Sequence, residues 1–310
     1  MSTLFLVDGN HTTARSFFIP QFQAFSNSEG FKTGVIFGFL QIIKGLSRNW
    51  DPDEMVVLWD VGKSEYRLAH YSDYKKDRVE GMDNTYYEQI QQLYDLLHVL
   101  GIVQLGINGV EADDLFGLIT CNHYPLREKY DKIIMVSSDH DFRQLIVGNS
   151  VIQYDPIRKK LFDEVALEKE KGIKPNQVVD YKALIGDISD SIPGIHGIGP
   201  GGAKKLLNKY GSIGQFDLEE LKKKKTTQRI ADEWDKLQLW RTIIQIFRDK
   251  DMLAGTQRQE YSEWCHWMIN HRDTLKTQKD KVEDYFKKFD FKWATKVESF
   301  LMDLGKVIRR

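Results

Sequence analysis

The sequence predicts an α/β fold in which a central, mostly parallel sheet is covered on both faces by helices and is followed by a mainly helical region. Three observations support this fold class. Short apolar runs recur in the first half of the chain, helical patterns separate them, and the strand signal fades after about residue 163. The 310 residues, 41% of them hydrophobic, are enough for one large core or two smaller ones.

The expected strands are continuous apolar runs, which are typical of strands buried on both faces of a parallel sheet. They lie at residues 3–7 (TLFLV), 55–59 (MVVLW) and 132–137 (KIIMVS). Apolar residues at helical spacing predict the helices between them, at residues 33–46, 86–100 and 111–122. A first α/β domain is therefore expected to extend to about residue 165.

Composition excludes several classes of protein. No stretch approaches eighteen consecutive apolar residues, and the N-terminus lacks a basic segment followed by a long apolar one, so neither a membrane span nor a secretory signal is predicted. Cys121 and Cys265 are too few and too far apart for a disulfide framework or a CxxC metal site, and both are expected to be buried or incidental thiols.

The net charge of −1 hides an uneven distribution of charge along the chain. Basic residues gather at residues 63–78, at residues 222–225 and from residue 272 onward. In the first of these stretches they alternate with tyrosines, as in proteins that bind single-stranded nucleic acid. A solvated surface is the alternative for Lys63 and Lys76.

Acidic residues follow each predicted strand. They are Asp8 after the first, Asp60 after the second, and Asp139 and Asp141 after the third. Ligands of open α/β sheets bind beyond the carboxyl ends of the strands, so these acids are expected at one edge of the sheet. The helix predicted at residues 111–122 starts there with Glu111, Asp113 and Asp114. An ordinary turn, or an acid near a helix dipole, explains one of these positions but not all of them.

Charge repulsion makes such a cluster costly without cations. Two carboxylates about 4 Å apart repel by about 4 kcal/mol at an effective dielectric of roughly 20. Several pairs would cancel the roughly 5–15 kcal/mol that stabilises a domain. Ligand sets made only of oxygen suit Mg²⁺ or Mn²⁺, and the number of acids suggests two ions. No histidine pair with metal-binding spacing is present, and His140 is expected to be a turn residue.

A second region of interest is the stretch GDISDSIPGIHGIGP at residues 186–200, which adds Asp187 and Asp190. Its glycines, Gly194, Gly197 and Gly199, predict a hairpin; the helix after it should begin at Pro200 and end at Gly211. Such a hairpin presents unpaired backbone N–H groups to a phosphate, which favours DNA binding. A plain glycine-rich turn between helices is the alternative.

In their order along the chain, these residues resemble the motifs of the structure-specific 5′-nucleases, which include flap endonucleases, the 5′-nuclease domain of bacterial DNA polymerase I and phage ribonuclease H. The resemblance covers about residues 1–250 and rests on VDGN at 7–10, WD at 59–60, R-x₆-YKxxR at 67–78, EADD at 111–114, SDHD at 138–141 and GDxxDxxPGxxGIG at 186–199. It implies a PIN-like catalytic domain at 1–165 with an arch at about 63–95, a helix-hairpin-helix region at 166–250 and a helical extension at 251–310.

The resemblance also implies roles for individual residues. The metal-binding acids would be Asp8, Asp60, Glu111, Asp113, Asp114, Asp139, Asp141, Asp187 and Asp190. A first ion would be held mainly by Asp8, Asp60, Glu111, Asp113 and Asp139, an outer ion by Asp141, Asp187 and Asp190, and Asp114 would serve either. Catalysis would use Lys75 at the scissile phosphate together with Asp8, Asp60, Asp139 and Asp141.

Substrate contacts are implied in the same way. Tyr74 would stack on an unpaired base, and Arg67 and Arg78 would contact phosphates. The hairpin residues Gly197 and Gly199 would bind the DNA backbone and hold K⁺. Gly201 and Gly202 replace the family's usual Lys-Thr pair, so Lys204 or Lys205 is expected to supply that phosphate contact.

The expected function is a Mg²⁺-dependent 5′→3′ exonuclease and flap endonuclease, with ribonuclease H activity, that leaves a 5′-phosphate and a 3′-hydroxyl. Expected partners are branched DNA (a 5′ flap, a nicked or gapped duplex) and RNA–DNA primer duplexes during phage-type replication, for a monomer in the host cytoplasm. Residues 251–310 are expected to form a helical cap; a docking surface for replication proteins such as single-stranded DNA-binding protein is the alternative.

Two other functions stay open. One is a catalytically inactive protein of the same fold that binds branched DNA. The other is an RNA nuclease of the broader PIN type, against which the hairpin with Asp187 and Asp190 argues.

Overall fold

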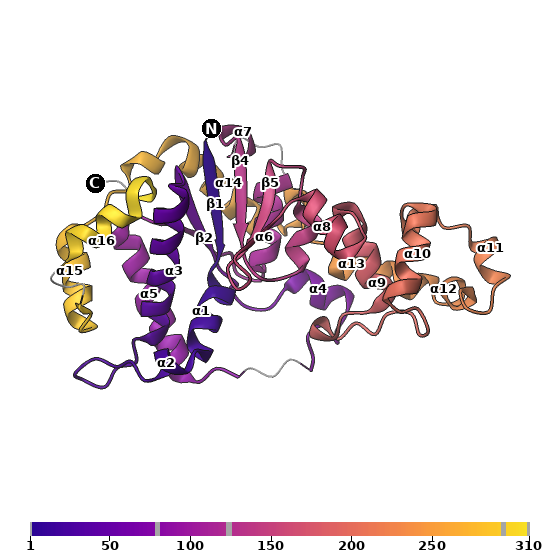
Figure 1. The fold of residues 1–310 in the computed structure, drawn as a ribbon, viewed down its shortest axis with the longest axis horizontal. Helices are drawn as coiled ribbons and strands as arrows, with labels where there is room; N and C mark the ends of the chain where they lie inside the picture. Colours follow the sequence, from indigo (N-terminus) through magenta and orange to yellow (C-terminus); the bar gives the residue numbers. More distant parts are fainter. Residues whose placement is uncertain (1, 78–80, 122–125, 293–295, 309–310) are drawn as a thin grey trace.

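The central sheet dominates the fold. The structure, a computed structural model, describes residues 2–77, 81–121, 126–292 and 296–308. Within these residues six strands are arranged in the order β3-β2-β1-β4-β5-β6 (Figure 1). Neighbours from β3 to β5 are parallel, and β6 is antiparallel to β5. The strands are β1 Thr3–Asp8, β2 Glu54–Leu58, β3 Val103–Leu105, β4 Lys132–Val136, β5 Val151–Asp155 and β6 Lys160–Phe162.

The helices of the first half alternate with these strands, as predicted. The three predicted strands are β1, β2 and β4, and the three predicted helices are α3, α5 and α6. Strands β3, β5 and β6 were not predicted, and the last of them ends at Phe162, where the strand signal was expected to fade. The helices up to this region are α1 Gly9–Phe18, α2 Pro20–Gln23, α3 Gly34–Trp50, α4 Glu65–His70, α5 Asn84–Leu100, α6 Ala112–Cys121, α7 Leu126–Lys129 and α8 Glu164–Lys171.

Local sequence signals fix the helix ends. The Asp83 side chain accepts a hydrogen bond from the backbone N–H of Tyr86 and begins α5. Gly101, at a φ of +76°, ends the same helix in the left-handed conformation that glycine adopts without strain. These two signals set the length of α5, which packs against one face of the sheet.

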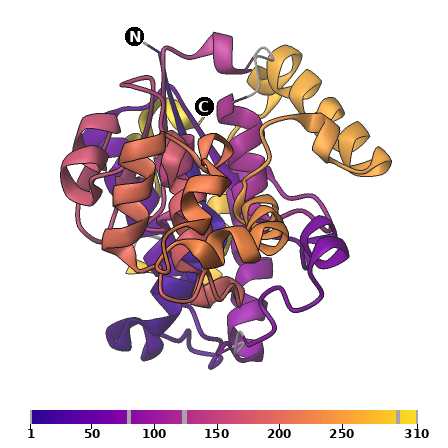
Figure 2. The same cartoon turned by 90° about the vertical axis from the view of Figure 1, so that its right-hand side faces the viewer.

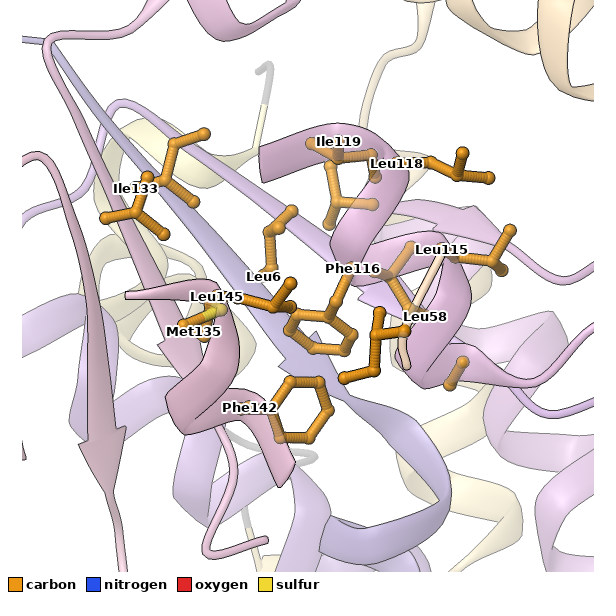
Figure 3. Packing of buried hydrophobic residues seen from close by; sticks show 14 of the residues in the cluster. Leu6, Leu58, Leu115, Phe116, Leu118, Ile119, Ile133, Met135, Phe142 and Leu145 are labelled. Atoms are coloured by element: carbon orange, nitrogen blue, oxygen red, sulfur yellow. The ribbon is translucent and has the colours of Figure 1, made fainter. Parts of the chain in front are cut away.

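The two faces of the sheet belong to two separate cores. Leu4 and Leu6 of β1 lie in the core that also contains Phe116 of α6 (Figure 3). The alternate residues Phe5 and Val7 lie in the core on the other face, which α3 and α5 cover. All four strand residues are at most 1% exposed. Burying each such side chain contributes about 1.5–3 kcal/mol, so the double covering predicted from the continuous apolar strands is confirmed.

A third core lies in the helical region beyond the sheet. Ala203, Leu207 and Trp240 are among its buried residues. Its helices extend toward one end of the molecule (Figure 1), and Figure 2 looks onto that end. The predicted helix between Pro200 and Gly211 is confirmed as α10. The elements are α9 Val178–Ile185, a 3₁₀ turn η3 Ile188–Asp190, α10 Pro200–Tyr210, α11 Leu218–Lys222, α12 Gln228–Asp232 and α13 Trp234–Ile244.

The C-terminal helices pack back onto the sheet domain. They are α14 Gly255–Asn270, α15 Lys279–Lys288 and α16 Val297–Leu304. Tyr261 and Met268 of α14 join the first core, and Phe286 of α15 joins the second. We refer to these C-terminal helices, which pack against both cores, as the cap. Arg272, 1% exposed, donates to Glu54 at 2.8 Å and ties the cap to the start of β2.

The cysteines and the helix lengths agree with the expectations from composition. Cys265 is buried and Cys121 half-buried, and both are free thiols. Among the residues that the structure describes, no helix has the length and apolar character needed to cross a membrane.

Candidate metal-dependent active site

The strand ends bring their acids to one edge of the sheet. Asp8 ends β1 and caps α1, because its carboxylate accepts hydrogen bonds from the backbone N–H of His11 and from Ser137 Oγ, both at 2.9 Å. Asp60 follows β2 and accepts a hydrogen bond at 2.7 Å from the N–H of Ala112, the first residue of α6. The acids are therefore fixed at the junctions between strands and helices.

Two groups of three carboxylates lie side by side at this edge. Asp113, Asp139 and Asp141 form one group, and Asp141, Asp187 and Asp190 form the other. In each group the oxygens lie within 4.8 Å of one another. Asp141 belongs to both groups. This differs from the expected division, in which Asp141 served only the outer ion.

A cavity of about 280 Å³ lies at these acids, between the sheet edge and the helical region. Asp113 from α6, Asp139 and Asp141 line one part of it, and the turn η3 with Asp190 lines another. The cavity therefore collects acids from parts of the chain that are far apart in sequence.

Burial, together with neighbouring carboxylates, raises the pKa of several of the acids at this edge. Burial, reinforced by the Asp60 carboxylate, raises the pKa of Asp8 to about 7. Burial and then the charge of Asp139 hold the pKa of Asp113 well above its ordinary value. Burial also raises the pKa of Asp141 to about 7, although a neighbouring lysine opposes the shift. Carboxylates that resist ionisation together in this way fit sites for divalent cations, which would neutralise them.

Lys182 of α9 was missed by the sequence analysis. Its ammonium contacts the carboxylates of both Asp141 and Asp187. Burial opposes the charge on Lys182, but the two carboxylates raise its pKa. Nothing in the spacing of Lys182 marks it in the sequence. The turn at Gly186, with a φ of +89°, reverses the chain after α9 and brings this residue to the acids.

Lys75 stands at the wall of the same cavity. Its Nζ lies 2.6 Å from Glu111 Oε1 and 3.9 Å from Asp190 Oδ1. Burial opposes its charge, but Glu111 and then Asp190 raise the pKa of Lys75. The side chain keeps 24% of its surface exposed. It is therefore cationic and accessible, and its contact with a scissile phosphate stays a prediction.

Arg67 and Asp114 form a buried pair at the wall of the cavity, which Arg67 lines. The Arg67 guanidinium donates to both carboxylate oxygens of Asp114, at 2.6 and 2.8 Å. Asp114 is fully buried and also accepts from the N–H of Phe247 at 3.1 Å. In this structure the two residues are therefore paired with each other. Metal binding by Asp114 and a phosphate contact by Arg67, which is 3% exposed but lines the cavity, stay predictions.

Glu111 and Tyr74 are joined by a hydrogen bond. Glu111 accepts hydrogen bonds from Tyr74 OH and Arg67, both at 2.9 Å, and from Lys75. Burial opposes its ionisation, but Lys75 and Arg67 hold the pKa of Glu111 below its ordinary value. Its oxygens serve these donors, so Glu111 is outside both carboxylate groups. Tyr74 is 7% exposed and lines the cavity, and its stacking on a base stays a prediction.

The glycine hairpin lies apart from the cavity. Gly197 has a φ of +89°, and a Cβ built there would meet no atom within 4 Å, so a ligand can approach its backbone closely. Gly199 caps the start of α10, on which Lys204 is half-buried and Lys205 exposed. None of these four residues lines the acidic cavity. The expected phosphate contact of Arg78 lies outside the described residues.

This arrangement agrees with the comparisons with known proteins. Residues 3–177 match the family model of the 5′-3′ exonuclease, N-terminal resolvase-like domain. The chain belongs to the 5′-3′ exonuclease family. Residues 173–266 match the second model of this family, the 5′-3′ exonuclease, C-terminal SAM fold.

Relatives of this 5′-3′ exonuclease family member are similar in sequence and in fold. The chain is 34% identical to a 5′-3′ exonuclease of Aquifex aeolicus over 239 residues, 77% of this chain and 75% of that protein. It is 31% identical to DNA polymerase I of Streptococcus pneumoniae over 269 residues, 84% of this chain but 30% of that protein.

Solved structures share the fold at lower identity. T5 5′-exonuclease with bound zinc ions superposes with a TM-score of 0.73 at 20% identity, covering 87% of this chain and 99% of that one. The catalytic core of Rad2 in complex with DNA substrate gives 0.57 at 16% identity, covering 98% and 92%.

Proposed function

We propose that this member of the family is a metal-dependent 5′→3′ exonuclease and flap endonuclease that hydrolyses phosphodiesters to leave a 5′-phosphate and a 3′-hydroxyl. The observation that carries the proposal is the pair of carboxylate groups that share Asp141 at the carboxyl edge of a parallel sheet. The cationic Lys75 at the wall of the same cavity supports a phosphate-bearing substrate.

The cofactors we propose are two Mg²⁺ ions, for which Mn²⁺ can substitute. Asp113, Asp139 and Asp141 would hold one ion, and Asp141, Asp187 and Asp190 the other. Divalent ions bound there would lower the pKa of a coordinated water and offset negative charge on the departing oxygen. Oxygen ligands without histidine or cysteine favour Mg²⁺ over zinc.

The chain's own residues orient and neutralise the substrate. Lys75, held by Glu111, would stabilise the negative charge that develops on the phosphate. Asp8 and Asp60 lie close enough to Asp113 for their charges to raise its pKa, so they add to the field that attracts cations. Lys182 contacts two carboxylates of the second group, Asp141 and Asp187, and would give up these contacts when cations bind there.

DNA would be bound mainly outside the cavity. Gly197, Gly199, Lys204 and Lys205 would contact the backbone of a duplex, with K⁺ at the hairpin carbonyls. We assign catalysis to residues 1–165, with the arch at about 63–95, DNA binding to residues 166–250 and the cap to residues 251–310. The proposed substrates are 5′ flaps, nicked or gapped duplexes and RNA–DNA primers. The proposed setting is phage-type replication, by a monomer in the host cytoplasm.

A cleavage time course tests this function. Three 5′-labelled substrates would be compared: a flap, a nicked duplex and an RNA-primed duplex, each in Mg²⁺, in Mn²⁺ and in EDTA. We expect short 5′-phosphorylated products in either metal and none in EDTA. The Asp141→Asn variant serves as the inactive control, because it lacks a ligand of both groups.

Two other outcomes would show that the protein has a different function. Tight binding of the flap without cleavage in Mg²⁺ or Mn²⁺ would identify an inactive binder of branched DNA. A strong preference for single-stranded RNA over every branched DNA would instead identify an RNA nuclease of the PIN type.

A further inference from the structure

Ile188 is an apolar side chain placed at an acidic cavity. It is 96% exposed, more than any other large hydrophobic residue that the structure describes. It lies in the turn η3 between Asp187 and Asp190, and it lines the cavity together with Lys75. Single exposed apolar residues are common on proteins, so the exposure alone carries no function. The position of Ile188, between two acids of one carboxylate group, does point to a function.

The turn that carries Ile188 is fixed on both sides. Asp187 and Ile192 exchange backbone hydrogen bonds of 2.7 and 2.8 Å. The N–H of Ser191 donates to the carbonyl of Ile188 at 3.2 Å, and Tyr71 OH donates to the carbonyl of Ser191 at 3.0 Å. The backbone under the side chain is thus ordered before any ligand arrives, which lowers the entropic cost of a contact there.

The neighbours of Ile188 do not bury it, so its side chain is open to an apolar partner on a bound ligand. On the proposed function, a nucleotide phosphate enters the cavity near Asp141 and Lys75. The sugar and the base follow the phosphate within a few bonds, and every base has an apolar face on which side chains pack without regard to sequence. The acids attract the cations, the cations and Lys75 attract the phosphate, and an aliphatic group beside them has no part in that attraction.

We infer that Ile188 packs against the base of a nucleotide next to the scissile phosphate and so positions that phosphate in the cavity. The inference rests on the proposed function and extends it to a substrate contact. A protein segment is a poorer occupant. Any segment that covered Ile188 would also cover the mouth of the cavity that Ile188 lines, and it would exclude the substrate.

The test compares side chains at Ile188 on substrates with and without a base. The variants are Ile188→Ser, which removes the apolar group, and Ile188→Met, which keeps one. Met302→Ser is the matched control, because Met302 is 65% exposed on α16, at the other end of the molecule from α10 (Figure 1). Each protein meets a flap duplex with all bases present and two duplexes with an abasic residue on one or the other side of the scissile phosphate.

On the intact flap we expect Ile188→Ser to lower both kcat/KM and affinity by about tenfold, the size expected for losing part of a buried aliphatic contact. Ile188→Met and Met302→Ser should stay close to the wild type. On one of the abasic duplexes, wild type and Ile188→Ser should become equal, because the partner of the side chain is gone. Unchanged melting temperatures would confirm that the exposed substitutions leave the fold intact.

An equal loss on all three duplexes, or no loss on any, would overturn the inference. Affinity is measured by fluorescence anisotropy with Ca²⁺ in place of Mg²⁺, separately from cleavage. If the wild type binds the flap but fails to cut it in Mg²⁺, the proposed function fails. The base-dependence of affinity at Ile188 still decides the inference in that case.

Discussion

Asp141 contributes an oxygen to both carboxylate groups, so its replacement affects both candidate cation sites at once. We expect Asp141→Asn to lower kcat on a flap substrate by about 10² or more, because it removes charge stabilisation that acts at the reacting phosphate. The affinity for DNA should change by less than about threefold, since the DNA contacts proposed for α10 are untouched. Single-turnover kinetics and anisotropy measure the two quantities.

Asp284→Asn is the control for this experiment, because Asp284 is an exposed acid of α15. It should change neither rate nor affinity. Equal losses of rate and affinity in Asp141→Asn would argue that Asp141 acts in binding.

The raised pKa of Asp8 predicts how the metal-free protein responds to pH. The folded protein holds this proton up to a pH of about 7, whereas the ordinary value is 3.8. Between these values the folded state binds more protons than the unfolded state, so raising the pH lowers stability. Asp8→Asn cannot ionise. Its stability relative to wild type should be greater at pH 8 than at pH 5.5, by roughly 2 kcal/mol.

Urea unfolding in EDTA at the two pH values provides this measurement. Asparagine is a good helix cap, so the start of α1 is preserved. A difference from wild type that is the same at both pH values would show that Asp8 ionises normally in the folded protein.

The sequence was ambiguous about the roles of two neighbouring residues. Asp113 and Asp114 are adjacent and chemically identical, and both were expected to bind metal. Successive residues of a helix point about 100° apart, so one faces the cavity acids and the other faces Arg67. The motif located the acidic edge correctly. The motif alone could not show which of the two acids pairs with Arg67, because Arg67 and Asp114 are 47 residues apart in sequence.

At the scale of elements, Arg67 holds three helices together. It lies on α4, binds Asp114 of α6, and donates to the carbonyl of Ile243 in α13 at 2.9 Å. Removing one partner of a buried pair costs about 3–5 kcal/mol. We therefore expect Asp114→Ala to lower the free energy of unfolding by this amount. The Mn²⁺ affinity of the folded fraction should stay unchanged in a calorimetric titration.

Asp139→Ala is the opposite case, because Asp139 is an exposed member of a carboxylate group. It should weaken Mn²⁺ binding with little loss of stability. If Asp114→Ala fails to fold, the double variant Arg67→Met/Asp114→Leu should recover part of the stability, since it leaves no unpaired charge. Weaker Mn²⁺ binding by folded Asp114→Ala would instead support a metal role for Asp114.

The missed elements share a physical cause. Strand β3 has three residues, too few for a periodic pattern, and β6 also has three. In β5 a buried glutamine, Gln153, interrupts the apolar run; its side chain donates to the carbonyl of Ser137 at 2.8 Å. Longer strands with uninterrupted apolar residues were found correctly. Short edge strands depend on neighbours that the local sequence does not contain.

At the scale of the whole molecule, the pair of Arg272 and Glu54 joins the cap to the sheet. Both side chains are at most 2% exposed and they are 218 residues apart in sequence. Arg272→Leu leaves Glu54 buried without its partner, so it should lower the free energy of unfolding by about 3–5 kcal/mol. Thermal and urea unfolding measure the loss.

Lys287→Ala tests the specificity of this effect. Lys287 is 65% exposed on α15 and pairs loosely with Asp284. Its loss should change stability by less than about 0.5 kcal/mol. If Arg272→Leu lowers the free energy of unfolding as little as Lys287→Ala does, then the cap is held by apolar packing alone.

Both cores pack β1 against segments from late in the sequence. Leu4 of β1 packs in the same cluster as Met268, and Phe5 in the same cluster as Ile308. During synthesis the first strand must therefore wait, solvated or protected by chaperones, until residues up to 308 have left the ribosome. The two hydrophobic cores, and with them the frame around the acids, are complete only when these late segments have packed.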